Sequence, residues 1–128
     1  MVIRFHIPGG EMAVEAAVFF REARRSQIRR MLKMYRESGS GGREYGELAR
    51  WLSETAAGVQ DEIRALQEEY DVALRRVSEK SGLKEARREL SRLNTVAGEI
   101  KREMEIRGKL LVRYGKILKD AERILGTE

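Results

Sequence analysis

The sequence predicts an all-α fold: a long antiparallel helical hairpin (a coiled-coil arm) with an N-terminal helix packed at its open end, preceded by one short β-strand arm. Three observations predict it. Apolar residues recur at alternating spacings of three and four from Leu83 to Leu125. Charged residues make up 37% of the chain, and a single Pro leaves few breaks for a many-stranded sheet. The 128 residues have the length of one domain, so we expect a single domain over residues 1–128.

The first element is a strand. Residues 2–7 read Val-Ile-Arg-Phe-His-Ile, and this alternation of apolar and polar residues ends at Pro8-Gly9-Gly10, so we assign residues 1–10 to a strand or arm. No later segment resembles a partner strand, and a lone strand leaves its hydrogen-bonding groups unpaired. Pairing of Val2–Ile7 with a second copy or a different subunit predicts a homo-oligomer or a partner protein. The alternative is an extended arm lying on a helix.

The second element is a basic helix over residues 11–37. Glu11 and Glu15 lie in its early turns, where the helix dipole favours negative charge. The run Ser-Gly-Ser-Gly-Gly at residues 38–42 then predicts a loop.

Two long helices follow, over residues 44–80 and 83–125, separated by a helix stop at Ser81-Gly82. If the chain reverses there, facing residues have numbers that sum to about 163, and this places apolar residues such as Ile63 and Ile100 opposite each other along one seam. That symmetry predicts an antiparallel hairpin. Because a two-helix arm buries little surface, the exposed hairpin also favours self-association or a partner protein.

A second apolar flank beside the seam, near Trp51 and Ile117, marks the open end of this hairpin. Apolar residues of the 11–37 helix, such as Phe20 and Leu32, are suited to cover it.

The 11–37 helix also carries a basic stripe, whose residues fall within about 120° of its circumference at 100° per residue. The stripe consists of Arg21, Arg25, Arg29, Lys33 and Arg36. Residues 21–37 have a net charge of +5, equal to that of the whole chain. Such a stripe is suited to neutralising nucleic-acid phosphates. The alternative is that the acidic stretch Glu54–Asp71 packs beside it, in the same or a neighbouring subunit. A second cluster of cations over residues 75–92 is interleaved with acids, and we interpret it as solvated surface charge.

The composition argues against several kinds of site. The chain has no Cys, so it cannot form a thiolate site. Its single His argues against a metal site built from histidines and against a Ser-His-Asp triad. The carboxylates form no recognisable catalytic pair, and no Gly-Lys-Ser/Thr follows the Gly-rich loop. We therefore expect no enzyme, no catalytic residue, no cofactor and no metal. With no signal peptide or membrane span in the sequence, we expect a cytoplasmic protein that does not bind membranes. Abundant Arg and Glu fit a thermophilic source, although a GC-rich genome also raises the Arg content.

The segment Arg25-Ser-Gln-Ile-Arg-Arg-Met-Leu32 resembles the Ser-Gln-Ile/Leu-Arg segment of the small all-α subunit of type III CRISPR effector complexes. The C-terminal runs 111–114 and 125–128 are loosely similar to the end of that family. The N-terminal strand and the long hairpin depart from the family, which has a compact bundle of shorter helices. The resemblance implies a non-catalytic subunit that stacks along guide and target RNA.

Two hypotheses follow from the sequence. The first is a non-enzymatic, self-associating helical protein that binds nucleic-acid backbone through its basic helix, as a small subunit of a nucleoprotein complex would. The second is a coiled-coil scaffold or adaptor that mediates protein–protein interaction and binds no nucleic acid.

Overall fold

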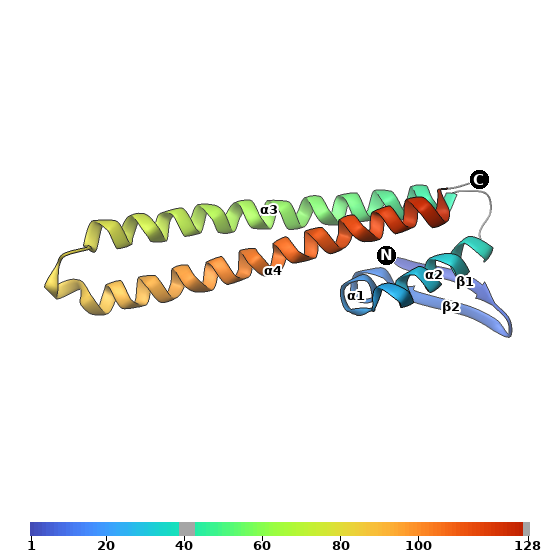
Figure 1. Cartoon of the computed structure of the whole chain (residues 1–128), viewed down its shortest axis with the longest axis horizontal. Coiled ribbons are helices and arrows are strands. Elements are labelled where there is room, and N and C mark those ends of the chain that lie inside the picture. Colours follow the sequence, from blue (N-terminus) through green and yellow to red (C-terminus); the bar gives the residue numbers. More distant parts are fainter. Residues whose placement is uncertain (39–42, 127–128) are drawn as a thin grey trace. The chain divides into compact units, whose positions relative to one another are not determined.

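The computed structural model describes residues 1–38 and 43–126, without the side chains of residues 43 and 44. These residues are mostly helical, with a two-stranded antiparallel sheet, and the predicted predominance of helix is confirmed (Figure 1). The chain divides into two compact units. Unit 1 comprises Met1–Ala56 and Val112–Glu128, and unit 2 comprises Ala57–Leu111.

Unit 1 begins with a β-hairpin. Strand β1 (Val2–Ile7) pairs antiparallel with β2 (Gly10–Glu15), from Val2 opposite Glu15 to Ile7 opposite Gly10. Between them, Pro8 and Gly9 form a turn in which Gly9 has a φ of 96°, a conformation that Gly adopts without strain.

This hairpin corrects two predictions. The strand Val2–Ile7 has its partner in the same chain, so it is no longer an argument for pairing with a second copy. Residues 10–15 form a strand rather than the first turns of a helix. Their sequence, Gly-Glu-Met-Ala-Val-Glu, is rich in helix formers, but the turn at Pro8-Gly9 brings them beside β1, and pairing overrides the intrinsic preference.

The predicted helix 11–37 is therefore wrong as a single element, and it is divided once more. Helix α1 (Ala16–Glu22) ends where Ala23 adopts an extended backbone with ψ 152°. Helix α2 (Arg25–Ser38) begins two residues later, and the Gln27 side chain accepts a hydrogen bond of 2.9 Å from the backbone N–H of Arg24. A side chain reaching back from the first turn in this way caps a helix start. The predicted loop at residues 38–42 lies, apart from Ser38, outside the described residues.

The core of unit 1 gathers side chains from both ends of the chain. Ile3 and Phe5 of β1, Phe20 of α1 and the apolar face of α2 are buried together with residues from the start of α3 (Arg43–Lys80) and the end of α4 (Arg87–Leu125). The rings of Phe20 and Trp51 lie 6.0 Å apart, and those of Phe5 and Tyr35 lie 6.3 Å apart. The remaining buried apolar residues of the unit are Ala16, Ile28, Met31, Leu32, Leu48, Leu52, Tyr114, Ile117, Ala121, Ile124 and Leu125.

Unit 2 consists of the second part of α3, a short connection and the first part of α4. Helix α3 ends at Lys80. Gly82, in the connection, has a φ of 88°, and a single 3-10 turn (Lys84–Ala86) precedes α4. These bounds lie close to the predicted 44–80 and 83–125. Two ion pairs join the helices: Lys80 Nζ to Glu89 Oε2 at 2.7 Å, and Arg107 Nε to Glu62 Oε2 at 2.9 Å. Over the described residues, no helix is long and apolar enough to cross a membrane.

Candidate nucleic-acid interface

The five residues of the basic stripe do not lie on one helix. Arg21 is on α1, while Arg25, Arg29, Lys33 and Arg36 are on α2, beyond the break at residues 23–24. The four on α2 fall within about 80° of its circumference at 100° per residue. The predicted stripe is therefore continuous over α2 alone.

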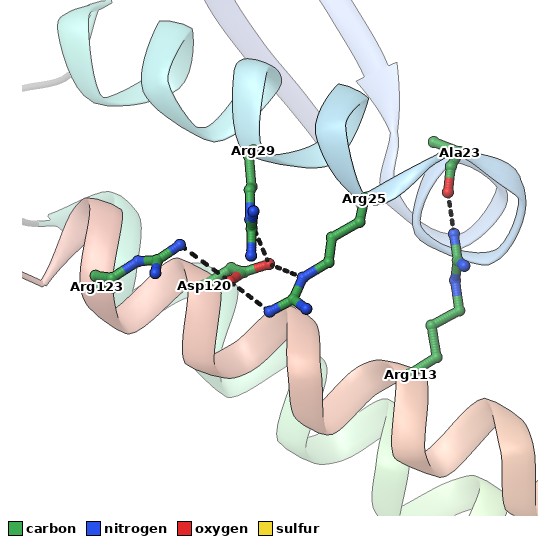
Figure 2. Close-up of polar contacts among 6 residues, drawn as sticks. All are labelled: Ala23, Arg25, Arg29, Arg113, Asp120 and Arg123. Carbon is green, nitrogen blue, oxygen red and sulfur yellow. Dashed lines mark hydrogen bonds and ion pairs between the residues drawn. The ribbon is translucent and has the colours of Figure 1, made fainter.

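Two of these arginines share a carboxylate from the far end of the chain (Figure 2). Arg25 donates from Nε to Asp120 Oδ2 at 3.1 Å and from Nη2 to Oδ1 at 3.2 Å, a bidentate contact. Arg29 donates from Nε to Oδ2 at 3.4 Å, and Arg123, one turn along α4, donates to Oδ1 at 3.4 Å. Three guanidinium groups therefore converge on one aspartate, and we call this set the Asp120 cluster.

The cluster is asymmetric in burial. The Asp120 side chain is only 3% exposed, whereas those of Arg25, Arg29 and Arg123 are 53%, 39% and 64% exposed. The hydrogen bond from Arg25 lowers the pKa of Asp120 below its usual value, against the opposing effect of burial, and the charges of Arg25 and Arg29 lower it further. The same hydrogen bond raises the pKa of Arg25. Asp120 is thus a buried anion whose partners remain open to solvent.

A further arginine connects α4 to the junction between α1 and α2. Arg113 donates from Nε to the backbone carbonyl of Phe20 and from Nη2 to that of Ala23, the second contact being drawn in Figure 2. Carbonyls at the end of a helix lack partners within that helix, so Arg113 satisfies two acceptors that the break after α1 would leave open.

The other cations of α2 are exposed. Arg30, Lys33 and Arg36 face solvent, as do Arg21 and Arg24, and within the described part of the chain none of them forms an ion pair. Together with the half-exposed Arg25 and Arg29, they give α2 a surface that carries several guanidinium groups and one ammonium group. Such a surface suits a polyanion.

The acid that pairs with the stripe within unit 1 is Asp120, which lies outside the stretch Glu54–Asp71 named in the alternative interpretation. Asp61 pairs with Arg64, and Glu62 pairs with Arg107. Arg25 and Arg29 thus have an acidic partner within unit 1, and packing of the stretch 54–71 of a neighbouring subunit against the stripe stays a prediction.

Sequence reasoning missed Asp120 and Arg113, although a signal for both exists. Asp120 lies three residues after Ile117 and four before Ile124, so it occupies the second apolar flank as its single acid. Arg113 lies four residues before Ile117 on the same flank. A charged residue within a flank that is expected to be covered indicates a buried ionic contact.

Among the described residues, no group of three or more His, Asp or Glu side chains is arranged to hold a metal ion. No family model, curated protein or solved structure matches the chain.

Proposed function

We propose that the protein is a non-enzymatic, self-associating helical protein that binds nucleic-acid backbone through α2, without reading base sequence. The observation that carries this proposal is the geometry of Arg25 and Arg29, whose guanidinium groups are held by a buried carboxylate while about half of each side chain stays exposed. We also propose that it acts in the cytoplasm.

The Asp120 cluster supports binding by preorganisation. A guanidinium has five N–H donors, and Arg25 uses two nitrogens on Asp120, which leaves donors for a phosphate oxygen. Because the carboxylate fixes the side chain beforehand, less conformational entropy is lost when a phosphate binds. Lys33 and Arg36 extend the same surface by one to two turns.

The aromatic residues explain why we propose backbone contacts alone. Non-specific binding of single strands uses exposed aromatic rings on which bases stack. The aromatic residue of α2, Tyr35, is buried at 8% exposure and packs near Phe5, so it is not available for stacking. We expect binding that depends strongly on salt and weakly on sequence.

The long helices supply the self-associating part of the proposal, and we infer that α3 and α4 form an antiparallel coiled-coil hairpin within unit 2. Both ion pairs between the helices support this arrangement. Because α3 ends at Lys80 and α4 begins at Arg87, facing residues have numbers that sum to about 167, a shift of one helical turn from the predicted 163. Every predicted seam position of the unit apart from Leu83 is buried or half-buried. These are Val59, Ile63, Leu66, Tyr70, Ala73, Val77, Ala86, Leu90, Leu93, Ala97, Ile100, Met104, Arg107 and Leu111.

The resemblance of residues 25–32 to the small subunit of type III CRISPR effector complexes supports a place in a nucleoprotein complex, since those residues form the first half of α2.

A scaffold or adaptor without nucleic acid is the second candidate, and one observation favours it. Arg25 and Arg29 already have a carboxylate partner, so part of the basic charge of α2 serves the fold. In that case the exposed cations would be replaceable without loss of function.

A binding series in rising salt separates the two candidates. Lys33→Glu with Arg36→Glu reverses two exposed charges that do not touch Asp120, and Lys101→Glu with Lys109→Glu makes the same charge change in unit 2. With labelled single-stranded RNA and duplex DNA, the first pair should weaken binding at least tenfold and reduce the slope of log K against log salt by about 1.5. The control pair should retain at least half of the affinity. Equal loss in both pairs, or no binding by the wild type, would refute the α2 interface.

A further inference from the structure

On one flank of unit 2, an acidic, an apolar and a basic side chain follow one another along α3, and the same three kinds follow in reverse order along α4. We call this flank the Glu–Val–Arg face. It consists of Glu69, Val72, Arg76, Arg92, Val96 and Glu99. All six are exposed, including the two valines at 38% and 40%. Where helices pair in coiled coils, apolar residues are flanked by charged residues that form salt bridges with the partner helix.

The six residues lie on the same side because each comes one position before a seam residue. Those seam residues are Tyr70, Ala73, Val77, Leu93, Ala97 and Ile100. In an antiparallel pair of right-handed helices, the positions that precede the seam on either helix fall on the same flank. Glu89 precedes the seam residue Leu90 and supports this placement. Its pKa is lowered mainly by the hydrogen bond from Lys80, and also by the charges of Arg92 and Arg76, so these two arginines lie near it.

The same six residues form three layers across the two helices. Glu69 is level with Glu99, Val72 with Val96, and Arg76 with Arg92, since the numbers in each pair sum to 168, one away from the value that the helix ends give. Along α3 the order is acid, valine, base, with spacings of three and four. Along α4 the order is base, valine, acid, with spacings of four and three. The face therefore has an acidic layer, an apolar layer and a basic layer.

Within one chain, Arg76 and Arg92 lie near Glu89, whose side chain pairs with Lys80 rather than with either arginine. None of the four charged residues forms an ion pair with a residue in the described ranges. Glu69 and Arg76 are seven residues apart, about 10 Å along the helix, which exceeds the screening length of about 8 Å at physiological salt. The four charged residues of the face, two acids and two bases, have no net charge among themselves.

We propose that the Glu–Val–Arg face docks against the same face of a second copy, antiparallel, about a two-fold axis through the Val72–Val96 layer. That rotation reverses the order of the layers, so Arg76 lies opposite the partner's Glu69, and Arg92 lies opposite the partner's Glu99. Each valine meets its own copy. The contact is isologous, as in most closed dimers. This inference rests on the antiparallel hairpin and the self-association proposed above.

The other flank of unit 2 lacks this pattern and provides the control. The positions that follow the seam there include Leu74 as the one large exposed apolar residue within residues 57–111 on that side. Its charged residues are Arg64, Asp71, Arg87, Lys101 and Glu105. They do not repeat in mirror order around Leu74, so a two-fold axis at that level would not match opposite charges.

Charge reversal tests the pairing. The mass of the nuclease-treated protein is measured against concentration by sedimentation equilibrium, and the wild type should dimerise. Arg76→Glu with Arg92→Glu, and separately Glu69→Arg with Glu99→Arg, should each raise the dimer dissociation constant at least tenfold. An equimolar mixture of the two variants should restore dimers, because one face is then wholly acidic and the other wholly basic. Arg87→Glu with Lys101→Glu, on the other flank, should change the dissociation constant less than twofold.

Cysteine crosslinking tests the position of the axis, because the chain contains no Cys of its own. Val72→Cys and Val96→Cys should each give covalent dimers with a short bis-maleimide, and Leu74→Cys should not. A wild type that stays monomeric, equal crosslinking of all three variants, or failure of the mixture to restore dimers would overturn the proposal. A monomer that still binds nucleic acid would leave the α2 interface standing. Dimers insensitive to these reversals would overturn the proposed face and leave self-association standing on another surface.

Discussion

Arg25 binds Asp120 through two hydrogen bonds, at 3.1 and 3.2 Å, across 95 residues of sequence. The contact joins the first turn of α2 to the last turns of α4 within unit 1. Because Asp120 is buried and Arg25 is half exposed, the carboxylate depends on its partners more than they depend on it. This difference leads to the first two predictions.

Asp120→Asn should destabilise unit 1. The amide keeps the size of the side chain but loses its charge, and one end of it presents donors to arginines that also donate. We expect a loss of about 2 kcal/mol in the free energy of unfolding, measured by urea denaturation. Asp61→Asn makes the same change at a side chain that is 76% exposed and should alter stability by less than about 0.5 kcal/mol. Equal effects of the two changes would contradict a structural role for the cluster.

The Asp120 cluster should also make stability depend on acidic pH. Folding lowers the pKa of Asp120 below its usual value of 3.8, so the unfolded chain binds the proton more tightly. The stabilisation is therefore fully present above about pH 5 and is lost as the pH falls below 4, towards the folded pKa. Urea midpoints of the wild type should fall more steeply over this range than those of Asp120→Asn. Glu89, whose pKa is also lowered, adds a contribution that both proteins share.

Arg113→Met should loosen α1. The methionine keeps much of the apolar stem but removes both donors to the carbonyls of Phe20 and Ala23. We expect a loss of about 1–2 kcal/mol and faster hydrogen exchange of the backbone amides in residues 16–24. Lys116→Met, at an exposed position one turn further on, should leave that exchange unchanged. Uniformly faster exchange across the whole chain would indicate a global effect instead.

Two glycines of unit 2 should respond to alanine with opposite signs. Gly82, in the connection between the helices, has a φ of 88°, so a side chain there should cost about 1 kcal/mol. Gly98 lies within α4, where the added methyl group of alanine would meet no neighbouring atom within 4 Å, so alanine there should stabilise the helix by up to about 1 kcal/mol. Thermal unfolding followed by circular dichroism measures both changes. A stabilising Gly82→Ala would contradict the left-handed turn.

The long helices were predictable because their signal is repeated many times. Fourteen of the predicted seam positions within residues 57–111 are buried or half-buried, and a single misplaced residue in such a run does not change the assignment of a helix. The register between the two helices was harder to predict from the sequence than the helices themselves. It depends on where one helix ends and the next begins, and Leu83 and the 3-10 turn at Lys84–Ala86 move that point by several residues.

The N-terminal region shows why the rest was not predictable. Residues 10–15 pair with β1 despite a composition that favours helix, because the preceding turn and the partner strand determine their conformation. The hydrophobic periodicity of the segment itself contains no information about either. The break at Ala23–Arg24 contains no Gly or Pro from which the end of a helix could be predicted. For the candidate site, the charge density of α2 was visible in the sequence, but the contact with Asp120 joins segments more than 90 residues apart, which no local pattern encodes.

Unit 1 is assembled from residues 1–56 and 112–128, and this has a consequence for the order of folding during synthesis. The β-hairpin, α1 and α2 leave the ribosome first, but Arg113, Ile117 and Asp120 follow some 90 residues later. At a synthesis rate of about 5–20 residues per second, the apolar face of α2 therefore stays uncovered for several seconds until the end of α4 has been made. Unit 2 has no such delay, because its helices are neighbours in the sequence. We expect the nascent chain to fold from its middle outwards, so that the surface of α2 is completed last.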